Sequence, residues 1–269
     1  MKLAAVQMVS GPDVDANLEV AERLLGQAAA QGAGLVLLPE YFCLMGRHER
    51  DKLGIMEGAD GPLQQFLADC ARRYGLVVVG GTVPLKSPRI NKVYNSCLVY
   101  GQDGRRLGRY DKIHLFGFKR GAERFDEAAS IQPGRTPVVV DLPAGPGVLP
   151  LRVGLSVCYD LRFPELYRQM APLDLIVVPS AFTYTTGQAH WSLLLRARAV
   201  ENQCFVLAAA QGGVHPSGRH TWGQSMVVDP WGTVLAEQAQ GEGVVLAELD
   251  LVRMAEVRQG LPALTHRVV

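Results

Sequence analysis

Cys158 is the side chain in this sequence best placed to act as a nucleophile. Residues 149–157 form an apolar run typical of a buried strand, and Pro164 followed by Glu165 predicts a helix start just beyond it. Cys158 is therefore expected on a turn between a strand and a helix. Ligands collect at such turns in open α/β folds, and backbone N–H groups there favour a thiolate. Most cysteines are inert packing, however, so position alone leaves a structural role open.

Two charged residues stand where a charge is costly unless it is paired. Glu40 closes the apolar run LVLLPE, and Lys112 lies among apolar and aromatic residues in RYDKIHLF. Burying an unpaired charge is expensive, so each residue needs either a partner or a route to solvent. The structural alternatives are a solvated loop acid for Glu40 and a snorkelling side chain for Lys112.

The composition excludes several classes of protein. The chain has 269 residues, is 48% hydrophobic and 20% charged, and has a formal net charge of +1, which argues against nucleic-acid binding. No apolar stretch reaches the length of a membrane span. The five cysteines are widely spaced without a CxxC pair, which argues against disulfides or zinc and favours a reducing cytoplasm. His215 and His220 share a Gly/Pro/Ser loop without further ligands, so no metal site is predicted.

The predicted elements alternate along the chain. Apolar runs predict strands, and apolar residues at helical spacing predict helices between them. Two hairpins of similar outline, around Asp103-Gly104 and Asp229-Pro230-Trp231-Gly232, hint at two related halves. A sandwich of two sheets flanked by helices would accommodate both. Residues 116–134 are rich in glycine and charge and are expected to form a long loop at the rim of a pocket. The predicted strands cover 2–9, 76–83, 174–182, 204–210 and 243–249, and the predicted helices cover 15–31, 63–74, 188–203 and 251–259.

Several of these segments together resemble the nitrilase superfamily of carbon–nitrogen hydrolases. LVLLPE, RYDKIHLF and GLSVCYDLRFPELYR are similar to the three segments that carry that family's Glu–Lys–Cys triad, in the same order. PSAFTYTTGQAHW, LLRARAVENQ and GQSMVVDPWGTVLAE resemble further family segments, so the resemblance spans almost the whole chain. It is strongest to the Nit-type branch.

The resemblance implies a fold and a mechanism. The fold would be α/β, a four-layer αββα sandwich of two mixed β-sheets flanked by helices, with residues 1–269 forming a single domain. Cys158 would attack an amide carbonyl, and Glu40 would serve as the general base and acid. Lys112 would lower the thiol pKa and hold the oxyanion together with the backbone N–H of Tyr159. Glu127, ahead of Pro133-Gly134, matches the family's second glutamate.

The resemblance also implies a substrate class. An amidase of this branch would hydrolyse a primary amide of a small carboxylate-bearing molecule through a cysteine thioester and release ammonia, with deaminated glutathione as the first candidate. An ω-amide, an N-carbamoyl compound, or a catalytically silent binding role are the alternatives. Arg162 could anchor the carboxylate, or it could pair structurally with Asp160 or Glu165. Phe182 and Thr186 could line the pocket.

Partners and cofactors follow from the same resemblance. No metal and no cofactor are expected, and the partner is a small-molecule amide, without nucleic acid or membrane. Helices near Cys158 and over 188–203 would form a homodimer or a larger homo-oligomer. One departure concerns the substrate: the segment Gly117 to Asp126 differs from the shorter acidic segment expected after the lysine motif.

Overall fold

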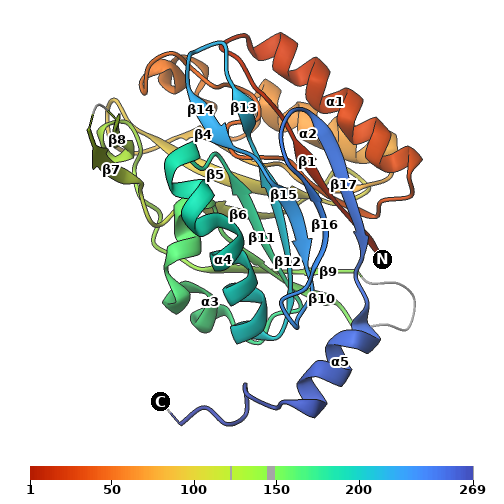
Figure 1. The fold of residues 1–269 in the computed structure, drawn as a ribbon. Helices are drawn as coiled ribbons and strands as arrows, with labels where there is room; N and C mark the ends of the chain where they lie inside the picture. The colour runs from red at the N-terminus through yellow and green to blue at the C-terminus, as the bar shows by residue number, and fades with distance from the viewer. Residues whose placement is uncertain (122, 144–148, 269) are drawn as a thin grey trace.

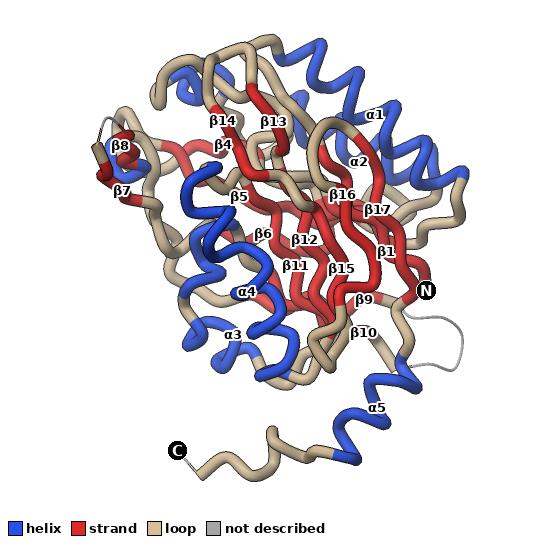
Figure 2. Tube along the Cα trace, in the orientation of Figure 1, coloured by secondary structure: helices blue, strands red, loops and turns tan. Residues whose placement is uncertain are grey.

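The fold consists of two large β-sheets packed face to face, with helices on the outer face of each (Figure 1). The computed structural model describes residues 1–121, 123–143 and 149–268. Figure 2 shows α1 and α2 on one side of the strands and α3 and α4 on the other. This arrangement confirms the predicted αββα sandwich with two mixed sheets.

The first sheet contains seven strands. Its central strands β1, β2 and β3 are parallel to one another, and β17, β5, β4 and β6 add antiparallel pairs. The strand order is β17 (Gly243–Glu248), β1 (Lys2–Gln7), β2 (Leu35–Leu37), β3 (Val77–Val79), β5 (Val93–Tyr100) and β4 (Val83–Lys86), with β6 (Arg106–Asp111) also pairing with β5.

The second sheet contains six strands, of which β10, β11 and β12 are parallel. Its order is β16 (Val234–Gln238), β15 (Ser225–Val228), β12 (Phe205–Ala210), β11 (Leu175–Ser180), β10 (Leu151–Leu155) and β9 (Val138–Leu142). Each large sheet thus contains one of the two predicted hairpins. Two small hairpins stand apart from the sheets: β7 (Gly117–Arg120) with β8 (Glu123–Asp126), and β13 (Gly212–Val214) with β14 (His220–Trp222).

The helices begin and end at recognisable capping residues. The carboxylates of Asp13 and Asp250 accept backbone N–H groups at the starts of α1 and α5, and Thr183 does the same for α4. A proline occupies the first turn of α2 and of α3. The bounds are α1 Val14–Ala30, α2 Pro62–Tyr74, α3 Pro164–Met170, α4 Tyr184–Asn202 and α5 Leu251–Gly260. No helix among the described ranges is both long and apolar enough to cross a membrane.

Strand β1 shows how the layers are held together. Leu3 and Ala5 point into a core shared with the second sheet, while Ala4 and Val6 point toward α1 and α2. Because both faces of the strand are buried, its sequence is continuously apolar rather than alternating. We propose, from the core that the two sheets share, that residues 1–269 form a single domain.

Two predicted elements were wrong in detail. The strand expected over 76–83 is divided into β3 and the start of β4, because the chain turns at Gly80-Gly81. Gly81 has φ of 54°, and a Cβ there would lie 2.1 Å from the carbonyl oxygen of Pro39. The loop expected over 116–134 contains the β7–β8 hairpin and a short 3₁₀ turn at Glu127–Ala129.

Candidate active site

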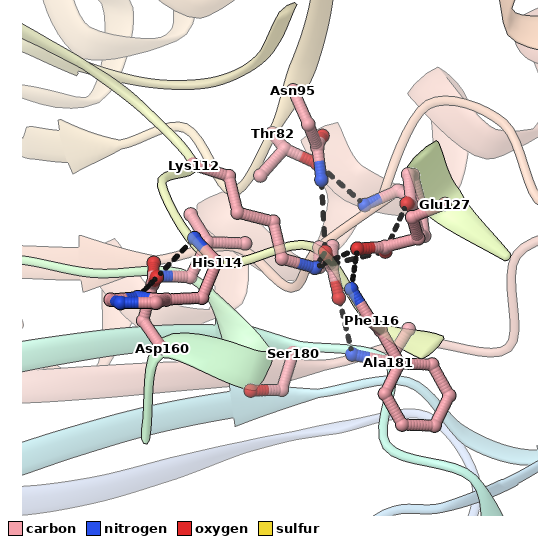
Figure 3. Close-up of polar contacts among 12 residues, drawn as sticks. Thr82, Asn95, Lys112, His114, Phe116, Glu127, Asp160, Ser180 and Ala181 are labelled. Atoms are coloured by element: carbon pink, nitrogen blue, oxygen red, sulfur yellow. Dashed lines mark hydrogen bonds and ion pairs between the residues drawn. The ribbon is translucent and has the colours of Figure 1, made fainter. Parts of the chain in front are cut away.

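The side chains predicted to do chemistry meet between the two sheets, where four strands end. Glu40 follows β2, Lys112 follows β6, Cys158 follows β10 and Ala181 follows β11. The first two strands belong to one sheet and the last two to the other, so the site is built from both halves of the sandwich. In Figure 3 the side chains of Asn95 and Lys112 and the backbone of Ala181 converge on one carboxylate, which their contacts identify as that of Glu40.

Glu40 is a buried carboxylate with every oxygen in use. Its side chain is 1% exposed, so the alternative of a solvated loop acid is wrong. Oε1 accepts from Lys112 Nζ and from Asn95 Nδ2, both at 2.9 Å, and Oε2 accepts from the Ala181 backbone N–H at 3.0 Å. The side-chain amide of Gln211 also donates to the Glu40 carbonyl oxygen at 3.1 Å. Three of these contacts fix the carboxylate, and the fourth holds the backbone of Glu40.

Lys112 lies between two carboxylates. Its side chain is fully buried, which excludes the snorkelling alternative. Nζ is 2.9 Å from Glu40 Oε1 and 2.8 Å from Glu127 Oε2. Glu127 is held in turn by the Tyr41 hydroxyl at 2.9 Å and by the Phe116 backbone N–H at 2.7 Å. The Lys112 ammonium and the carboxylates of Glu40 and Glu127, each costly to bury alone, are therefore tolerated together.

Cys158 begins a short 3₁₀ helix, Cys158–Arg162, that leads into α3. Its φ of 50° lies in the left-handed region, which is strained for a residue with a side chain. The residue is 8% exposed, and the interaction of its thiol with the Glu40 carboxyl lowers the pKa of that carboxyl. The strained turn therefore directs the sulfur toward the Glu40–Lys112 pair.

The electrostatics of the site favour a neutral thiol at rest. Burial raises the pKa of Cys158 well above its ordinary value, and the Glu40 carboxylate adds to that rise while Lys112 opposes it. The sequence interpretation was that backbone N–H groups favour the thiolate; the Ala181 backbone does lower the pKa of Cys158, but desolvation outweighs this effect. Burial also raises the pKa of Glu40, against the effect of Lys112. Glu40 is thus a stronger base than a free glutamate.

The ion pair between Lys112 and Glu127 shifts the pKa of both groups in the direction that keeps each of them charged. For Lys112, burial lowers the pKa, but Glu127 and Glu40 more than offset it and hold the pKa well above its ordinary value. For Glu127, burial raises the pKa, but the Lys112 ammonium more than offsets it and the pKa is lowered. Lys112 therefore stays charged beside an ionised Glu127 and can stabilise negative charge that develops nearby.

A small pocket opens beside the sulfur. It is lined by Phe116 and by side chains from the 3₁₀ helix that begins at Cys158, from the stretch after β11 and from the start of α4. It has room for little more than one water molecule. The structure brings the predicted residues Tyr159, Arg162, Phe182 and Thr186 to this pocket. The Arg162 guanidinium lies 5.7 Å from the Tyr159 ring and 5.4 Å from the Phe182 ring.

Neither structural pairing considered for Arg162 is observed. Asp160 is occupied by other groups, and Arg162 instead contacts His190 Nδ1 at 3.2 Å from its own Nη1. The guanidinium is therefore available to a ligand in the Cys158 pocket. Among the described ranges, no cluster of three or more His, Cys, Asp or Glu side chains could hold a metal ion.

Sequence reasoning missed several residues that hold the site together. Asn95 opens the segment read only as a hairpin strand, and Tyr41 directly follows Glu40. Asp160 was considered only as a partner of Arg162. The sequence position of Tyr41 was a usable signal, because a residue directly after a buried acid lies close to the partners of that acid. The contact of Asn95 with Glu40 is revealed only by the fold.

Comparisons with known proteins agree along the whole chain. The model of the carbon–nitrogen hydrolase family matches residues 2–259. The chain is 40% identical over 271 residues to a deaminated glutathione amidase of Synechocystis sp., covering 98% of this chain and 97% of that protein. It is 38% identical to the human deaminated glutathione amidase, covering 98% and 81%. The structure resembles Saccharomyces cerevisiae Nit3, a member of branch 10 of the nitrilase superfamily, with a TM-score of 0.84 at 33% identity over 97% and 94% of the two chains.

Proposed function

The chain belongs to the carbon–nitrogen hydrolase family, and from that premise we propose that Cys158, Glu40 and Lys112 are the catalytic residues of an amidase. The observation that carries the proposal is the buried Lys112 ammonium, held within 2.9 Å of both Glu40 and Glu127 beside a thiol on a strained turn. A nucleophile, a base and an oxyanion stabiliser are what amide hydrolysis requires.

The first half of the reaction forms a thioester. Glu40 takes the thiol proton as the sulfur of Cys158 attacks the carbonyl carbon, and the carbonyl electrons move to oxygen. The Lys112 ammonium and the Tyr159 backbone N–H stabilise this oxyanion. When the oxyanion collapses, the C–N bond breaks and Glu40 delivers its proton to the departing nitrogen. Because burial raises the pKa of the Cys158 thiol well above its ordinary value, we expect proton removal to accompany the attack.

The second half releases the acid. Glu40 takes a proton from water as the water oxygen attacks the thioester carbon. The new tetrahedral intermediate collapses, the C–S bond breaks, and the thiolate of Cys158 recovers the proton. Glu127 supports both halves by holding Lys112 in place and charged.

We propose deaminated glutathione as the substrate, because the relatives that match this chain over nearly its full length bear that name. The acyl half of that molecule ends in a 2-oxo acid, whose carboxylate lies at the end opposite the scissile amide, and Arg162 is the proposed anchor for it. Phe182 and Thr186 would line the acyl side of the pocket. Deaminated glutathione contains no primary amide, so with this substrate the leaving group is a dipeptide amine rather than the ammonia expected from the sequence; an ω-amide would release ammonia.

The alternatives within the same chemistry are an ω-amide and an N-carbamoyl compound. A panel of deaminated glutathione, 2-oxoglutaramate and N-carbamoyl amino acids, followed by both amine and ammonia release, separates them. The highest kcat/KM is expected for deaminated glutathione. A higher value for either other class would replace the proposed substrate.

Cysteine variants test the catalytic assignment. Cys158→Ala is expected to lose turnover of every amide in the panel, whereas Cys70→Ala, which replaces another buried cysteine on α2, should retain it. Mass spectrometry of the wild-type protein, quenched with acid during turnover, should detect an acyl group on Cys158, because the thioester is an obligatory intermediate of the proposed reaction. Undiminished turnover by Cys158→Ala would falsify the assignment.

We further propose that the chain forms a homo-oligomer through the outer face of α4. Leu193 and Val200 on that helix are 67% and 48% exposed, and Trp231 is 57% exposed. Val200 and the Trp231 turn are neighbours, because a Cβ built at Gly232 would lie 2.8 Å from Val200. Exposed apolar groups gathered in this way are typical of an interface. Sedimentation of wild type and Leu193→Lys tests this interface. Wild type should sediment as an oligomer and the variant at a lower mass. We also propose a cytoplasmic location, because all five cysteines are free, as is usual in a reducing compartment.

A further inference from the structure

A second and larger cavity, of about 400 Å³, lies next to the site. Three segments form it: the stretch after Glu40, the β8 strand of the β7–β8 hairpin, and the turn between β13 and β14. The two hairpins and the 3₁₀ turn at Asp51–Ile55 lie together in the upper left of Figure 1. The catalytic assignment above uses none of the charged side chains of this cavity.

The cavity shares walls with the active site. Tyr41 lines it and donates through its hydroxyl to Glu127, the partner of Lys112. Phe125 lines it too, and its ring centroid is 5.6 Å from that of Phe116, which lines the Cys158 pocket. The cavity is therefore adjacent to the active site, with Tyr41 and the Phe116–Phe125 pair between them.

The charge of the cavity favours an anion. Four cationic side chains, Arg47, Lys52, Arg124 and Arg219, line it against two carboxylates, Glu49 and Glu123. Glu49 is already paired with Lys52 at 2.8 Å. The cavity therefore has cationic groups in excess of its own carboxylates.

Arg219 is only weakly paired with the carboxylates of the cavity. Its nearest carboxylate oxygen, on Glu49, is 3.9 Å away, and its Nη1 otherwise contacts the sulfur of Met45 at 3.7 Å. The Arg219 Nε has no hydrogen-bond partner among the residues that the structure describes. The guanidinium carbon lies over the Phe125 ring, 5.2 Å from its centroid. A guanidinium binds a carboxylate through two parallel N–H groups.

We propose that this cavity is the subsite for the leaving-group side of the substrate and that Arg219 binds a carboxylate there. This inference rests on the proposed amidase function and extends it. Arg162 and Arg219 then lie on opposite sides of the scissile bond, so the preferred substrate carries a carboxylate at each end. A primary ω-amide has no group to place in the cavity. The cavity therefore distinguishes the two leading substrate classes.

Three substrates that share one acyl group test the proposal. They are deaminated glutathione, its C-terminal amide, which differs only in lacking the terminal carboxylate, and the primary amide. Wild type is expected to favour the free carboxylate over its amide by about 10-fold or more in kcat/KM, because the amide cannot form the charged hydrogen bonds with Arg219. Arg219→Gln should bring that ratio close to one, and Arg219→Lys should restore part of it. Arg89→Gln, at an exposed arginine outside the cavity, should keep the wild-type ratio.

The outcomes separate the two proposals. A wild-type ratio near one overturns the subsite without any variant, so a failure of Arg219→Gln to fold leaves the test decisive. An unchanged ratio in a folded Arg219→Gln protein overturns the role of Arg219. If wild type hydrolyses none of the three amides, the proposed function itself fails.

Discussion

The carboxylate of Asp160 accepts both the backbone N–H and the ring Nδ1 of His114, at 3.0 and 2.7 Å. His114 lies two residues after Lys112, and Asp160 lies two residues after Cys158. The pair therefore joins the loop that carries the cation to the turn that carries the nucleophile. Figure 3 shows the two side chains beside Lys112. Asp160 is fully buried, and its other oxygen accepts from the Tyr110 hydroxyl at 2.7 Å and the Val157 N–H at 2.9 Å.

Asp160→Asn is expected to reduce both stability and turnover. The amide nitrogen cannot accept, so at least one buried donor among Tyr110, His114 and Val157 loses its partner, at a cost of about 1–3 kcal/mol. The distance between the lysine loop and the cysteine turn then becomes less fixed, which should lower kcat more than it changes KM. Urea unfolding and steady-state kinetics on the same preparation measure both effects.

Glu165→Gln provides the matched control for this variant. Glu165 is exposed in the first turn of α3, five residues along the same segment. It should match wild type in both assays. An Asp160→Asn protein with wild-type stability and kcat would show that the tether is dispensable.

Lys112→Met is expected to abolish most activity and to destabilise the fold. The variant removes the oxyanion stabiliser, which should lower kcat by about 100-fold or more. It also leaves two carboxylates buried without their common cation, and breaking such a pair costs about 3–5 kcal/mol. Kinetics and urea unfolding measure the two losses separately.

A double variant separates the catalytic from the structural role of Lys112. Adding Glu127→Gln to Lys112→Met removes one of the unpaired carboxylates, so part of the stability should return while activity stays lost. Lys86→Met, at an exposed lysine on β4, serves as the control. Recovery of activity in the double variant would contradict a role for the ammonium at the oxyanion.

The parts of the site that could be predicted from the sequence are those where a charge interrupts an apolar run. Glu40 and Lys112 stand out because burial without a partner is costly, and each is the other's partner. Strand β1 and the helices α1 and α2 were predictable because the spacing of apolar residues along each segment is enough to identify it. Cys158 stood out through its place between a strand and a helix.

Contacts made across the sandwich could not be predicted in this way. Asn95 reaches Glu40 across 55 residues and Tyr110 reaches Asp160 across 50, and no local pattern encodes either distance. The direction of the Cys158 pKa also depends on how completely the site is buried, which only the packed fold decides. The hairpin at β7–β8 was missed because a charged, glycine-rich strand pair looks like a loop.

The acid limb of the pH–activity profile is expected to lie above pH 4.5, the ordinary pKa of a glutamate carboxyl. Glu40 works as a base in its deprotonated form, and burial raises its pKa, so activity should rise as pH increases through that raised value. Because the pKa of Lys112 is raised as well, loss of its charge should not reduce activity below pH 10.5. The pH dependence of kcat/KM measures both limbs. An acid limb at or below 4.5 would contradict the raised pKa, and Glu165→Gln should leave the limb unmoved.

His215 gives the fold a separate dependence on pH. Its Nδ1 lies 2.8 Å from the Ser10 carbonyl oxygen and its Nε2 lies 2.8 Å from the Thr221 hydroxyl. Burial lowers its pKa below the ordinary 6.5, and the nearby charges of Arg219 and His220 act in the same direction, against the Ser10 hydrogen bond. The unfolded chain therefore binds a proton at this residue more readily than the folded chain does.

His215→Asn is expected to reduce the loss of stability that wild type shows between pH 7.5 and pH 5.5. With a folded pKa below the unfolded one, the contribution of neutral His215 is complete above pH 6.5 and is lost as pH falls from 6.5 through the lowered folded value. Asparagine does not titrate there, so the free energy of unfolding of the variant should change less over this range, even if it is lower throughout. Urea unfolding at the two pH values measures the difference. His266→Asn, at an exposed histidine, should keep the wild-type dependence, and an equally steep dependence in His215→Asn would place the titrating group elsewhere.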